Sequence, residues 1–202
     1  MSADGAQWIG DVVAEHAPQA MRCLDAFHAI GWITDALDTV RRAVWNELRG
    51  GTGRSTPASK ALKGARWALW KNPERLNDTQ KATLASIQAT NRPLYRAYLL
   101  KERFREIFKV KGDTGRLLLK AWLRWAARFR IPAFVKVAQK IRRHLDEIHN
   151  TLDCGLSNAR SEATNTHLRV LTRRAYGYKS AEGLIAMADL TRGGLCPPLP
   201  GR

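Results

Sequence analysis

Residues 157–179 have the sequence SNARSEATNTHLRVLTRRAYGYK, in which a single carboxylate, Glu162, stands among amides and guanidinium groups. A structural helix surface more often pairs glutamate with lysine four residues apart. A lone acid among cationic and amide side chains suits a site that holds a metal ion against a phosphate. The polar residues around it are Asn158, Arg160, Asn165, Arg169, Arg173, Arg174 and Lys179.

The spacing around Glu162 predicts one shared helix face. The two asparagines lie four residues before and three residues after Glu162, and Arg169 lies seven residues after it. Residues at these offsets project from the same side of an α-helix. The cations that follow suit the C-terminal end of a helix dipole. A solvated basic helix without a partner is the alternative explanation, so the proposal needs further acids elsewhere in the chain.

The charge balance favours a polyanionic partner. The chain has 202 residues, with 34 Lys and Arg against 18 Asp and Glu, and a formal net charge of +16. This length suits one domain or two small ones, and 45% hydrophobic residues can form a core. The cations are spread along the chain, so nucleic acid is the expected partner. An ordinary basic or ribosome-associated protein is the alternative.

Other bulk features favour a reducing cytoplasm. Cys23, Cys154 and Cys196 are far apart and form no CxxC pair, which argues against a disulfide framework or a zinc ribbon. No apolar run approaches the roughly 18 residues of a membrane span. The first residues lack the basic and apolar regions of a signal peptide. We therefore expect no membrane partner.

Hydrophobic periodicity predicts a mainly α fold with nine helices and at most one short strand. The helices are expected at residues 6–16, 27–48, 60–71, 77–89, 91–108, 113–130, 134–152, 157–178 and 180–190. The strand is expected at residues 21–24. Residues 50–60, GGTGRSTPASK, have the composition of a loop and give the best internal boundary. The seven tryptophans lie in or near apolar helix faces, which favours core packing over stacking on bases.

Two acids near the start of the chain are candidates to join Glu162. Asp4 precedes Gly5 and an expected helix, and Asp25 follows the expected strand, three residues before His28. Separately, each could be a turn or cap residue, and Asp25 with His28 could be a metal pair. Three acids from distant parts of a chain can hold two divalent metals about 3.5–4 Å apart for phosphodiester chemistry.

The two ends of the chain resemble bacterial insertion-sequence transposases of the ISL-three family. The resemblance lies in residues 2–42, SADGAQWIGDVVAEHAPQAMRCLDAFHAIGWITDALDTVRR, and in residues 157–190. Its pattern is an opening Asp, then Asp-x-Phe-His, a helical insertion, Asn-x-x-x-Glu-x-x-Asn and Gly-Tyr. The matching residues are Asp4, Asp25, Phe27, His28, Asn158, Glu162, Asn165, Gly177 and Tyr178.

The resemblance implies a DDE transposase with a ribonuclease-H-like core that uses Mg²⁺ or Mn²⁺ for phosphodiester hydrolysis and strand transfer. By the family order, Asp4 is the second catalytic acid and Glu162 the third, and both are metal ligands. In a competing assignment, Asp4 is the first acid and Asp25 the second. Asp25 and His28 match an Asp-or-Cys-x-x-His signature, and we expect a mutual hydrogen bond at the start of the long helix. The DNA-contacting residues would be Asn158, Arg160, Asn165, Arg169, Arg173, Arg174 and Lys179.

The resemblance also implies a domain organisation. Residues 1–50 would be the C-terminal half of the ribonuclease-H-like core, and residues 51–153 a helical insertion domain that contacts transposon DNA. Residues 154–191 would carry the Glu-bearing helix that closes the core, and residues 192–202 would be a disordered tail. The early strands and the first catalytic Asp are expected outside this chain, so we expect a truncated transposase, inactive alone.

The expected partners are the transposon ends, target DNA and a full-length transposase as oligomer, in the bacterial cytoplasm at the nucleoid. The alternative is a truncated protein without catalytic activity, which binds DNA or inhibits transposase.

Overall fold

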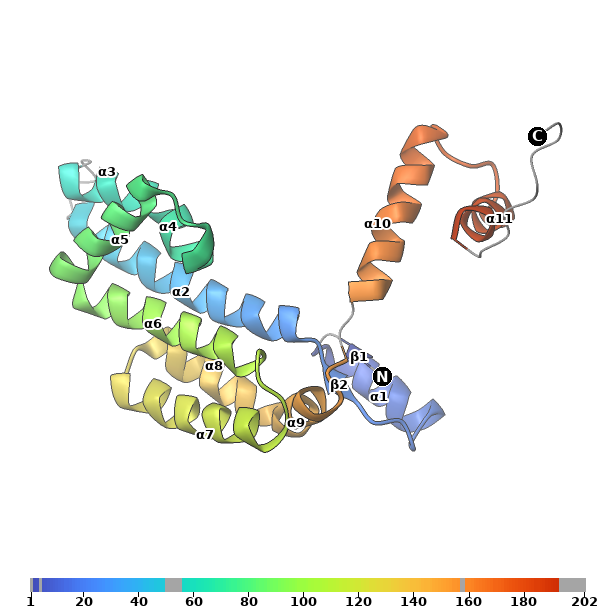
Figure 1. Cartoon of the computed structure of the whole chain (residues 1–202), viewed down its shortest axis with the longest axis horizontal. Helices are drawn as coiled ribbons and strands as arrows, with labels where there is room; N and C mark the ends of the chain where they lie inside the picture. Colours follow the sequence, from blue (N-terminus) through green and yellow to red (C-terminus); the bar gives the residue numbers. More distant parts are fainter. Residues whose placement is uncertain (1, 4, 50–55, 157–158, 193–202) are drawn as a thin grey trace. The chain divides into compact units, whose positions relative to one another are not determined.

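Helices dominate the computed structural model, which describes residues 2–3, 5–49, 56–156 and 159–192 (Figure 1). The α-helices are α1 Gln7–His16, α2 Ala26–Arg49, α3 Pro57–Gly64, α4 Arg66–Trp70, α5 Asp78–Thr90, α6 Arg92–Ile107, α7 Gly112–Phe129, α8 Pro132–Arg143, α9 Leu145–Cys154, α10 Ala159–Arg174 and α11 Ala181–Arg192. A 3-10 helix, η1, spans Pro73–Arg75. Strands β1 Ser2–Ala3 and β2 Cys23–Leu24 pair in parallel. The predicted mainly α class is confirmed.

The chain divides into two compact units, residues 1–157 and 158–202. In the first unit, α2 packs against α6 and α8, and α7 packs against the same two helices. In the second unit, α10 packs against α11. The division into domains remains a prediction, with its segments at residues 1–50, 51–153, 154–191 and 192–202.

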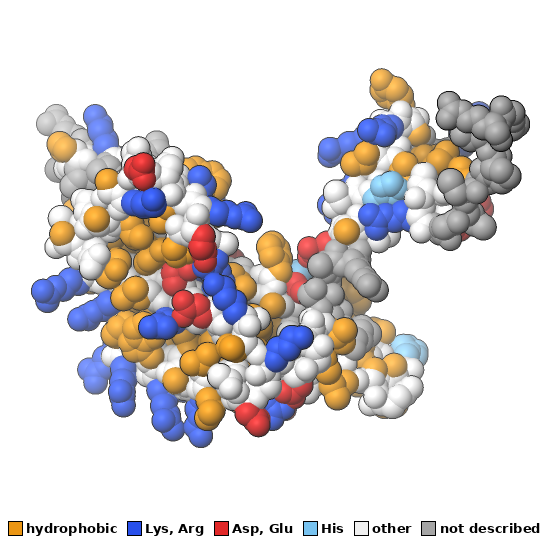
Figure 2. Space-filling model, in the orientation of Figure 1, with side chains coloured by type: hydrophobic (Ala, Val, Ile, Leu, Met, Phe, Trp, Pro, Cys, Tyr) orange, Lys and Arg blue, Asp and Glu red, His pale blue; other side chains and the backbone are white. Residues whose placement is uncertain are grey.

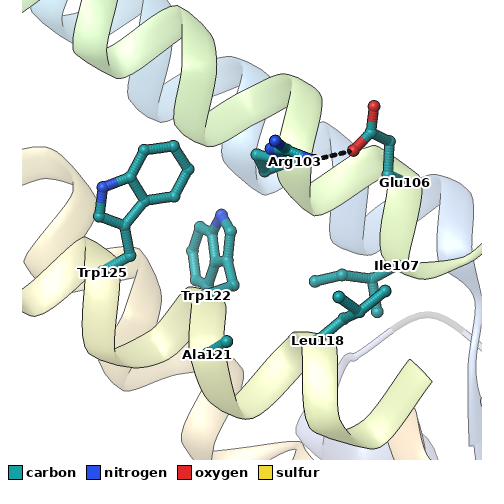
Figure 3. Close-up of a pocket in the computed structure, with 7 residues that line it drawn as sticks. All are labelled: Arg103, Glu106, Ile107, Leu118, Ala121, Trp122 and Trp125. Carbon is teal, nitrogen blue, oxygen red and sulfur yellow. Dashed lines mark hydrogen bonds and ion pairs between the residues drawn. The ribbon is translucent and has the colours of Figure 1, made fainter. Parts of the chain in front are cut away.

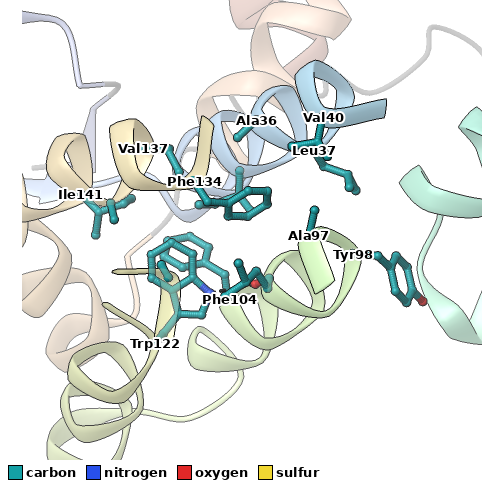
Figure 4. Close-up of a cluster of buried hydrophobic side chains, with 14 of the residues drawn as sticks. Ala36, Leu37, Val40, Ala97, Tyr98, Phe104, Trp122, Phe134, Val137 and Ile141 are labelled. Atoms are coloured by element: carbon teal, nitrogen blue, oxygen red, sulfur yellow. Dashed lines mark hydrogen bonds between the residues drawn. The ribbon is translucent and has the colours of Figure 1, made fainter. Parts of the chain in front are cut away.

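The core of the first unit lies between α2, α6, α7 and α8 (Figure 4). Phe104 and Phe134 are fully buried there, and the Phe104 ring lies 4.8 Å from that of Trp122, centroid to centroid. The indole Nε1 of Trp122 donates a 2.8 Å hydrogen bond to the Leu100 carbonyl. Each fully buried Leu, Ile or Phe stabilises such a core by about 1.5–3 kcal/mol.

The tryptophan prediction holds for five of the seven. Trp122 is buried, and four others are partly buried against the core: Trp32, Trp45, Trp70 and Trp125. Trp8 and Trp67 are 68% and 56% exposed, so they do not follow the predicted packing.

The expected helix at residues 60–71 is two helices that begin earlier. Pro57 occupies the first turn of α3, where its missing N–H is not needed. Thr56 and Ser59 form a capping box, because each side chain accepts a hydrogen bond from the other residue's backbone N–H, at 3.1 and 3.0 Å. A turn at Ala65, with φ −72° and ψ −9°, separates α3 from α4. The loop predicted for residues 50–60 therefore ends before Pro57, and residues 50–55 lie outside the described part.

The helix expected at residues 134–152 is also two helices, α8 and α9. His144 separates them with φ −107° and ψ 26°, and its ring packs 5.3 Å from that of Trp32, centroid to centroid. Ile141, Leu145 and Ile148 keep a helical spacing across this residue, so the periodicity could not reveal the break. The expected nine helices and one strand become eleven α-helices and two strands in the described residues.

The strands β1 and β2 and the helix α1 form a small βαβ unit. Ser2 pairs with Cys23 and Ala3 with Leu24, and α1 makes the crossover that parallel strands require. Cys23 and Leu24 are buried, as the predicted strand at residues 21–24 requires. Strand β1 was not predicted.

The second unit is a helical hairpin. Helix α10 ends in a left-handed turn, because φ is 53° at Tyr176 and 104° at Gly177. The Gly177 N–H closes that end with a 2.9 Å hydrogen bond to the Thr172 carbonyl. None of the helices in the described ranges is both long and apolar enough to span a bilayer.

Candidate functional site

Asp25 stands where β2 ends and α2 begins. The residue is 2% exposed, and its carbonyl accepts a 3.2 Å hydrogen bond from the Ala29 N–H. Nδ1 of His28 lies 3.0 Å from Oδ2 of Asp25, so the predicted hydrogen bond is present. A carboxylate only accepts hydrogen bonds, so His28 donates from Nδ1. In the neutral ring, this leaves a lone pair on Nε2.

Helix α9 holds the backbone that leads into this turn. Asn150 Nδ2 donates to the Arg22 carbonyl at 2.8 Å. Thr151 Oγ1 donates to the Leu24 carbonyl at 2.6 Å and also lies 2.8 Å from the Glu147 carbonyl of its own helix. Thr151 is buried, and a buried polar group without a hydrogen bond lowers the stability of the fold. Sequence reasoning missed both residues, because nothing in an amphipathic helix pattern marks the polar side chains that reach a distant strand.

The backbone just after strand β1 packs closely against α2. A Cβ on Gly5 would lie 2.6 Å from Cη2 of Trp32, so only glycine fits there without a shift of the indole. This packing places residue 5 against α2 and explains the glycine that follows Asp4. Asp4 itself, a predicted catalytic residue, lies outside the described residues.

Helix α10 brings part of the predicted DNA-contacting set together. Asn165, Arg169 and Arg173 follow one another at intervals of four residues. They line an open hollow of about 400 Å³ on α10, together with Leu168 and Thr172. Of the helix face predicted around Glu162, Asn165 and Arg169 line this hollow, and Glu162 does not.

Other predicted residues of this segment lie apart from the hollow. Glu162 is exposed in the first turn of α10, where a negative charge suits the helix dipole. Arg174 and Lys179 are exposed but do not line the hollow. Asn158 and the side chain of Arg160 lie outside what the structure describes.

The hairpin of the second unit is held by contacts that the sequence did not reveal. His167 Nε2 lies 3.0 Å from Thr191 Oγ1, and an Arg192 Nη1 donates to Thr164 Oγ1 at 3.4 Å. Both contacts join α10 to α11. They help to fix the rotation of α10 within its own unit.

A second hollow, of about 310 Å³, lies between α6 and α7 (Figure 3). Ile107, Leu118, Ala121, Trp122 and Trp125 give it an apolar lining. Its one carboxylate, Glu106, is 3.0 Å from Arg103 Nη1 and forms an ion pair with it. A paired acid among apolar side chains does not make a catalytic set.

A buried lysine ties α6 to the end of α4. Lys101 is 2% exposed and donates to the carbonyls of Leu69 and Trp70, at 2.8 and 3.2 Å. Its Nζ also lies 2.5 Å from Glu102 Oε1. Burial lowers the pKa of Lys101, because the charged form loses hydration. This cation at a helix C-terminus has a structural role that the sequence did not suggest.

An exposed ion pair borders this cluster. Glu74 accepts a 2.9 Å hydrogen bond from Arg105 Nη2. A hydrogen bond from its own backbone N–H, and then the Arg105 guanidinium, lower the pKa of Glu74 to about 2. This carboxylate is therefore charged under all ordinary conditions.

Known proteins resemble the chain along its whole length. The model of an ISL3-type family described as "Transposase" matches residues 1–188. The transposase for insertion sequence element IS1557, in two strains of Mycobacterium tuberculosis, is 49% identical over 219 residues, which cover 100% of this chain and 49% of the relative. The transposase for insertion sequence element IS1001 of Bordetella parapertussis is 28% identical over 172 residues, covering 84% of this chain and 41% of the relative.

The chain spans about half the length of the curated relatives that it matches. No solved structure matches it.

Proposed function

Because the chain belongs to the ISL3 (ISL-three) family of transposases, we propose that it serves in cutting and rejoining DNA at insertion-sequence ends. The relatives are named as transposases of insertion sequence elements, and they are about twice as long as the region that they share with this chain. The proposed activity is therefore that of a complete transposase, to which this chain contributes two acids and a DNA-contacting surface. The observation that carries the proposal is the family match over residues 1–188.

We propose that the first unit contains part of a ribonuclease-H-like core. The support is the parallel βαβ unit formed by β1, α1 and β2, since a helical crossover between parallel strands is characteristic of α/β sheets. A sheet of two two-residue strands is marginal by itself. A larger sheet that continues from these strands would stabilise them.

The proposed metal ligands are Asp4 and Glu162, as second and third acids of the family pattern. Ala3 and Leu24 are paired, and Asp4 and Asp25 are each the next residue in the sequence, which supports a grouping of acids at the carboxyl ends of the strands. The alternative, in which Asp25 is the second acid, rests on the same register. Carboxylate oxygens are the ligands that Mg²⁺ prefers, so the donor set fits Mg²⁺ or Mn²⁺. Such an ion would supply Lewis-acid activation of the phosphodiester.

Asp25 and His28 have a supporting role in this proposal. Their 3.0 Å contact fixes the first turn of α2 and orients the imidazole. The hydrogen bonds from α9 to the carbonyls of Arg22 and Leu24 hold the strand end from which Asp25 emerges. We propose that these contacts keep the end of β2 rigid during DNA cleavage.

We propose that α10 contacts the DNA backbone through Asn165, Arg169 and Arg173, which line one hollow. Arg160, Arg174 and Lys179 extend the positive charge of the segment, and Asn158 is proposed to orient Glu162. The support is the regular four-residue spacing and the exposure of these cations in the described part.

A plasmid-nicking assay with Mn²⁺ tests the proposal. The full chain, Glu162→Gln and a control, Glu182→Gln in α11, are incubated with supercoiled DNA. Nicking by the wild type and the control, but not by Glu162→Gln, would support catalysis by this chain. If no protein nicks but all shift DNA in a salt-dependent way, the chain binds DNA without cutting it, as a transposase-inhibiting protein would. A wild type that neither nicks nor shifts DNA contradicts the proposed function.

A further inference from the structure

Helix α7 carries a row of three cations at regular spacing, which we call the α7 row. Lys120, Arg124 and Arg128 are four residues apart and exposed. On the opposite side of the helix, the buried residues are Gly115, Leu119, Trp122, Leu123 and Ala126. The row therefore lies on the outer face of a helix whose inner face is fixed in the core. Figure 2 shows Lys and Arg side chains projecting along the edge of the molecule over this helix.

The α7 row has no acidic partner in the described part of the chain, whereas several other cations of the first unit form ion pairs. Ion pairs join Arg41 and Arg42 to Asp38, Lys81 to Asp78, Arg103 to Glu106 and Arg105 to Glu74. Among the described residues, no acid forms an ion pair with a member of the α7 row. Arg116, one step earlier in the series, is paired with Asp153.

This arrangement has a cost for the isolated protein. Like charges at i and i+4 on a helix repel each other, and the row contains two such pairs, 120–124 and 124–128. Glutamate at one of these positions would relieve the repulsion, yet the row contains only cations. An anion that binds across all three side chains would turn the repulsion into a stabilising contact.

We propose that the α7 row binds the phosphate backbone of double-stranded DNA, an inference that rests on the proposed function. Eight residues of α-helix rise about 12 Å between the ends of the row. One strand of duplex DNA carries a phosphate about every 3.4 Å of helix axis, so the row spans about three to four phosphates. Three cations held by a packed helix can contact successive phosphates without reading base sequence.

An anionic membrane surface is a less suitable partner for this helix. Helices that bind bilayers insert a broad apolar face, and the apolar face of α7 is already buried against α6 and α8. Only Leu117 and Leu118 are large, apolar and exposed on α7. RNA presents a phosphate backbone too, so it belongs in the test as a competing ligand.

The test compares two triple variants of the full chain that lose the same charge. The first is Lys120→Gln, Arg124→Gln and Arg128→Gln. The control is Lys60→Gln, Arg75→Gln and Arg92→Gln, which removes exposed cations from α3, η1 and the start of α6. Binding of a fluorescent DNA duplex of arbitrary sequence is measured by anisotropy between 50 and 300 mM salt, beside an RNA duplex and anionic vesicles. Circular dichroism checks that both variants fold.

We expect the α7 variant to bind DNA at least about tenfold more weakly at 150 mM salt and to lower the salt slope by about 2 to 3, since each phosphate contact contributes about 0.9. The control should weaken binding by less than about threefold, and by less at 300 mM than at 50 mM salt, because charges that do not contact the DNA are screened. Equal effects of the two triples would overturn the proposal, and so would a loss confined to RNA or vesicles. If wild type binds no DNA at all, the proposed function itself fails, whereas wild-type binding that the α7 variant retains refutes only the α7 row.

Discussion

Helices α7 and α10 display similar charges on different supports. Both carry cations at intervals of four residues, at 120, 124 and 128 in α7 and at 169 and 173 in α10. Leu119 of α7 is fully buried in the core of the first unit, whereas Val170 of α10 is 42% exposed. The described side chains of the second unit are at most half-buried. The cations on the surface of a helix therefore do not indicate how firmly that helix is held. The burial of the residues on its opposite face decides this.

The buried lysine of the first unit should give the largest difference between the two units. Lys101→Met removes the cation that satisfies the carbonyls at the end of α4 and takes away the 2.5 Å partner of Glu102, which keeps only Arg105, at 3.2 Å. We expect the free energy of unfolding to fall by about 3–5 kcal/mol, as when one partner of a buried pair is removed. Lys179→Met, at an exposed position of the second unit, should change it by less than about 0.5 kcal/mol.

Urea unfolding followed by tryptophan fluorescence measures the loss for Lys101→Met, because all seven tryptophans lie between residues 8 and 125, and circular dichroism follows Lys179→Met. Equal stability of Lys101→Met and the wild type would contradict the role assigned to Lys101.

Truncation of a leucine in each basic helix tests the supports of the two rows directly. Leu119→Ala in α7 empties a fully buried site, and we expect a loss of about 2–5 kcal/mol. Leu168→Ala in α10 affects a half-buried side chain, and the loss should stay below about 1 kcal/mol. Thermal unfolding by circular dichroism, beside fluorescence for the first unit, gives both values. A larger loss for Leu168→Ala would reverse the comparison.

Two threonine hydroxyls allow single hydrogen bonds of the two units to be compared. Thr151→Val removes the buried donor to the Leu24 carbonyl and should cost about 1–3 kcal/mol, because a buried acceptor is left unsatisfied. Thr172 of α10 donates within its own helix, to the Leu168 carbonyl at 2.9 Å. Thr172→Val should therefore cost less than about 0.5 kcal/mol. Urea titration of both variants measures this difference, and similar losses would show that α9 does not hold β2 as described.

The smallest effect is expected from pH. The pKa of Glu74 is about 2 in the folded chain, whereas the ordinary value for glutamate, 4.5, applies to the unfolded chain. As pH falls, the unfolded chain binds this proton first, so the stabilisation is complete above about pH 4.5 and is lost towards pH 2. Glu74→Gln should therefore show a smaller drop in Tm between pH 5 and pH 3 than the wild type. Glu47→Gln, an exposed change in α2, should keep the wild-type drop, and identical drops in all three proteins would refute the prediction.

Much of the fold follows from local pattern. The sequence predicts a helix at 113–130, and α7 spans Gly112–Phe129, because its apolar residues recur every three to four positions. Strand β1 has two residues, too few for any periodicity. The break at His144 lies within an unbroken apolar spacing, so backbone geometry rather than sequence pattern reveals it.

In the candidate site too, local interactions could be predicted and distant interactions could not. The contact between Asp25 and His28 spans three residues, and the resemblance to the family led us to expect it. Lys101 is followed by Glu102 and Arg103 in the sequence, as a surface residue often is, yet it is buried and bonds to a helix about 30 residues earlier in the chain. Thr151 meets Leu24 across 127 positions, a distance at which single-sequence patterns carry no signal.

That last hydrogen bond sets an order of events during protein synthesis. A ribosome adds about 5–20 residues per second, so Thr151 is made about 6–25 s after the Leu24 carbonyl that it binds. In a growing chain, the Asp25–His28 turn can form early, because both residues are neighbours in sequence. The backbone before this turn gains its hydrogen bonds to α9 only after α9 has been synthesised. The end of β2 is therefore among the last parts of the first unit to reach its final arrangement in a nascent chain.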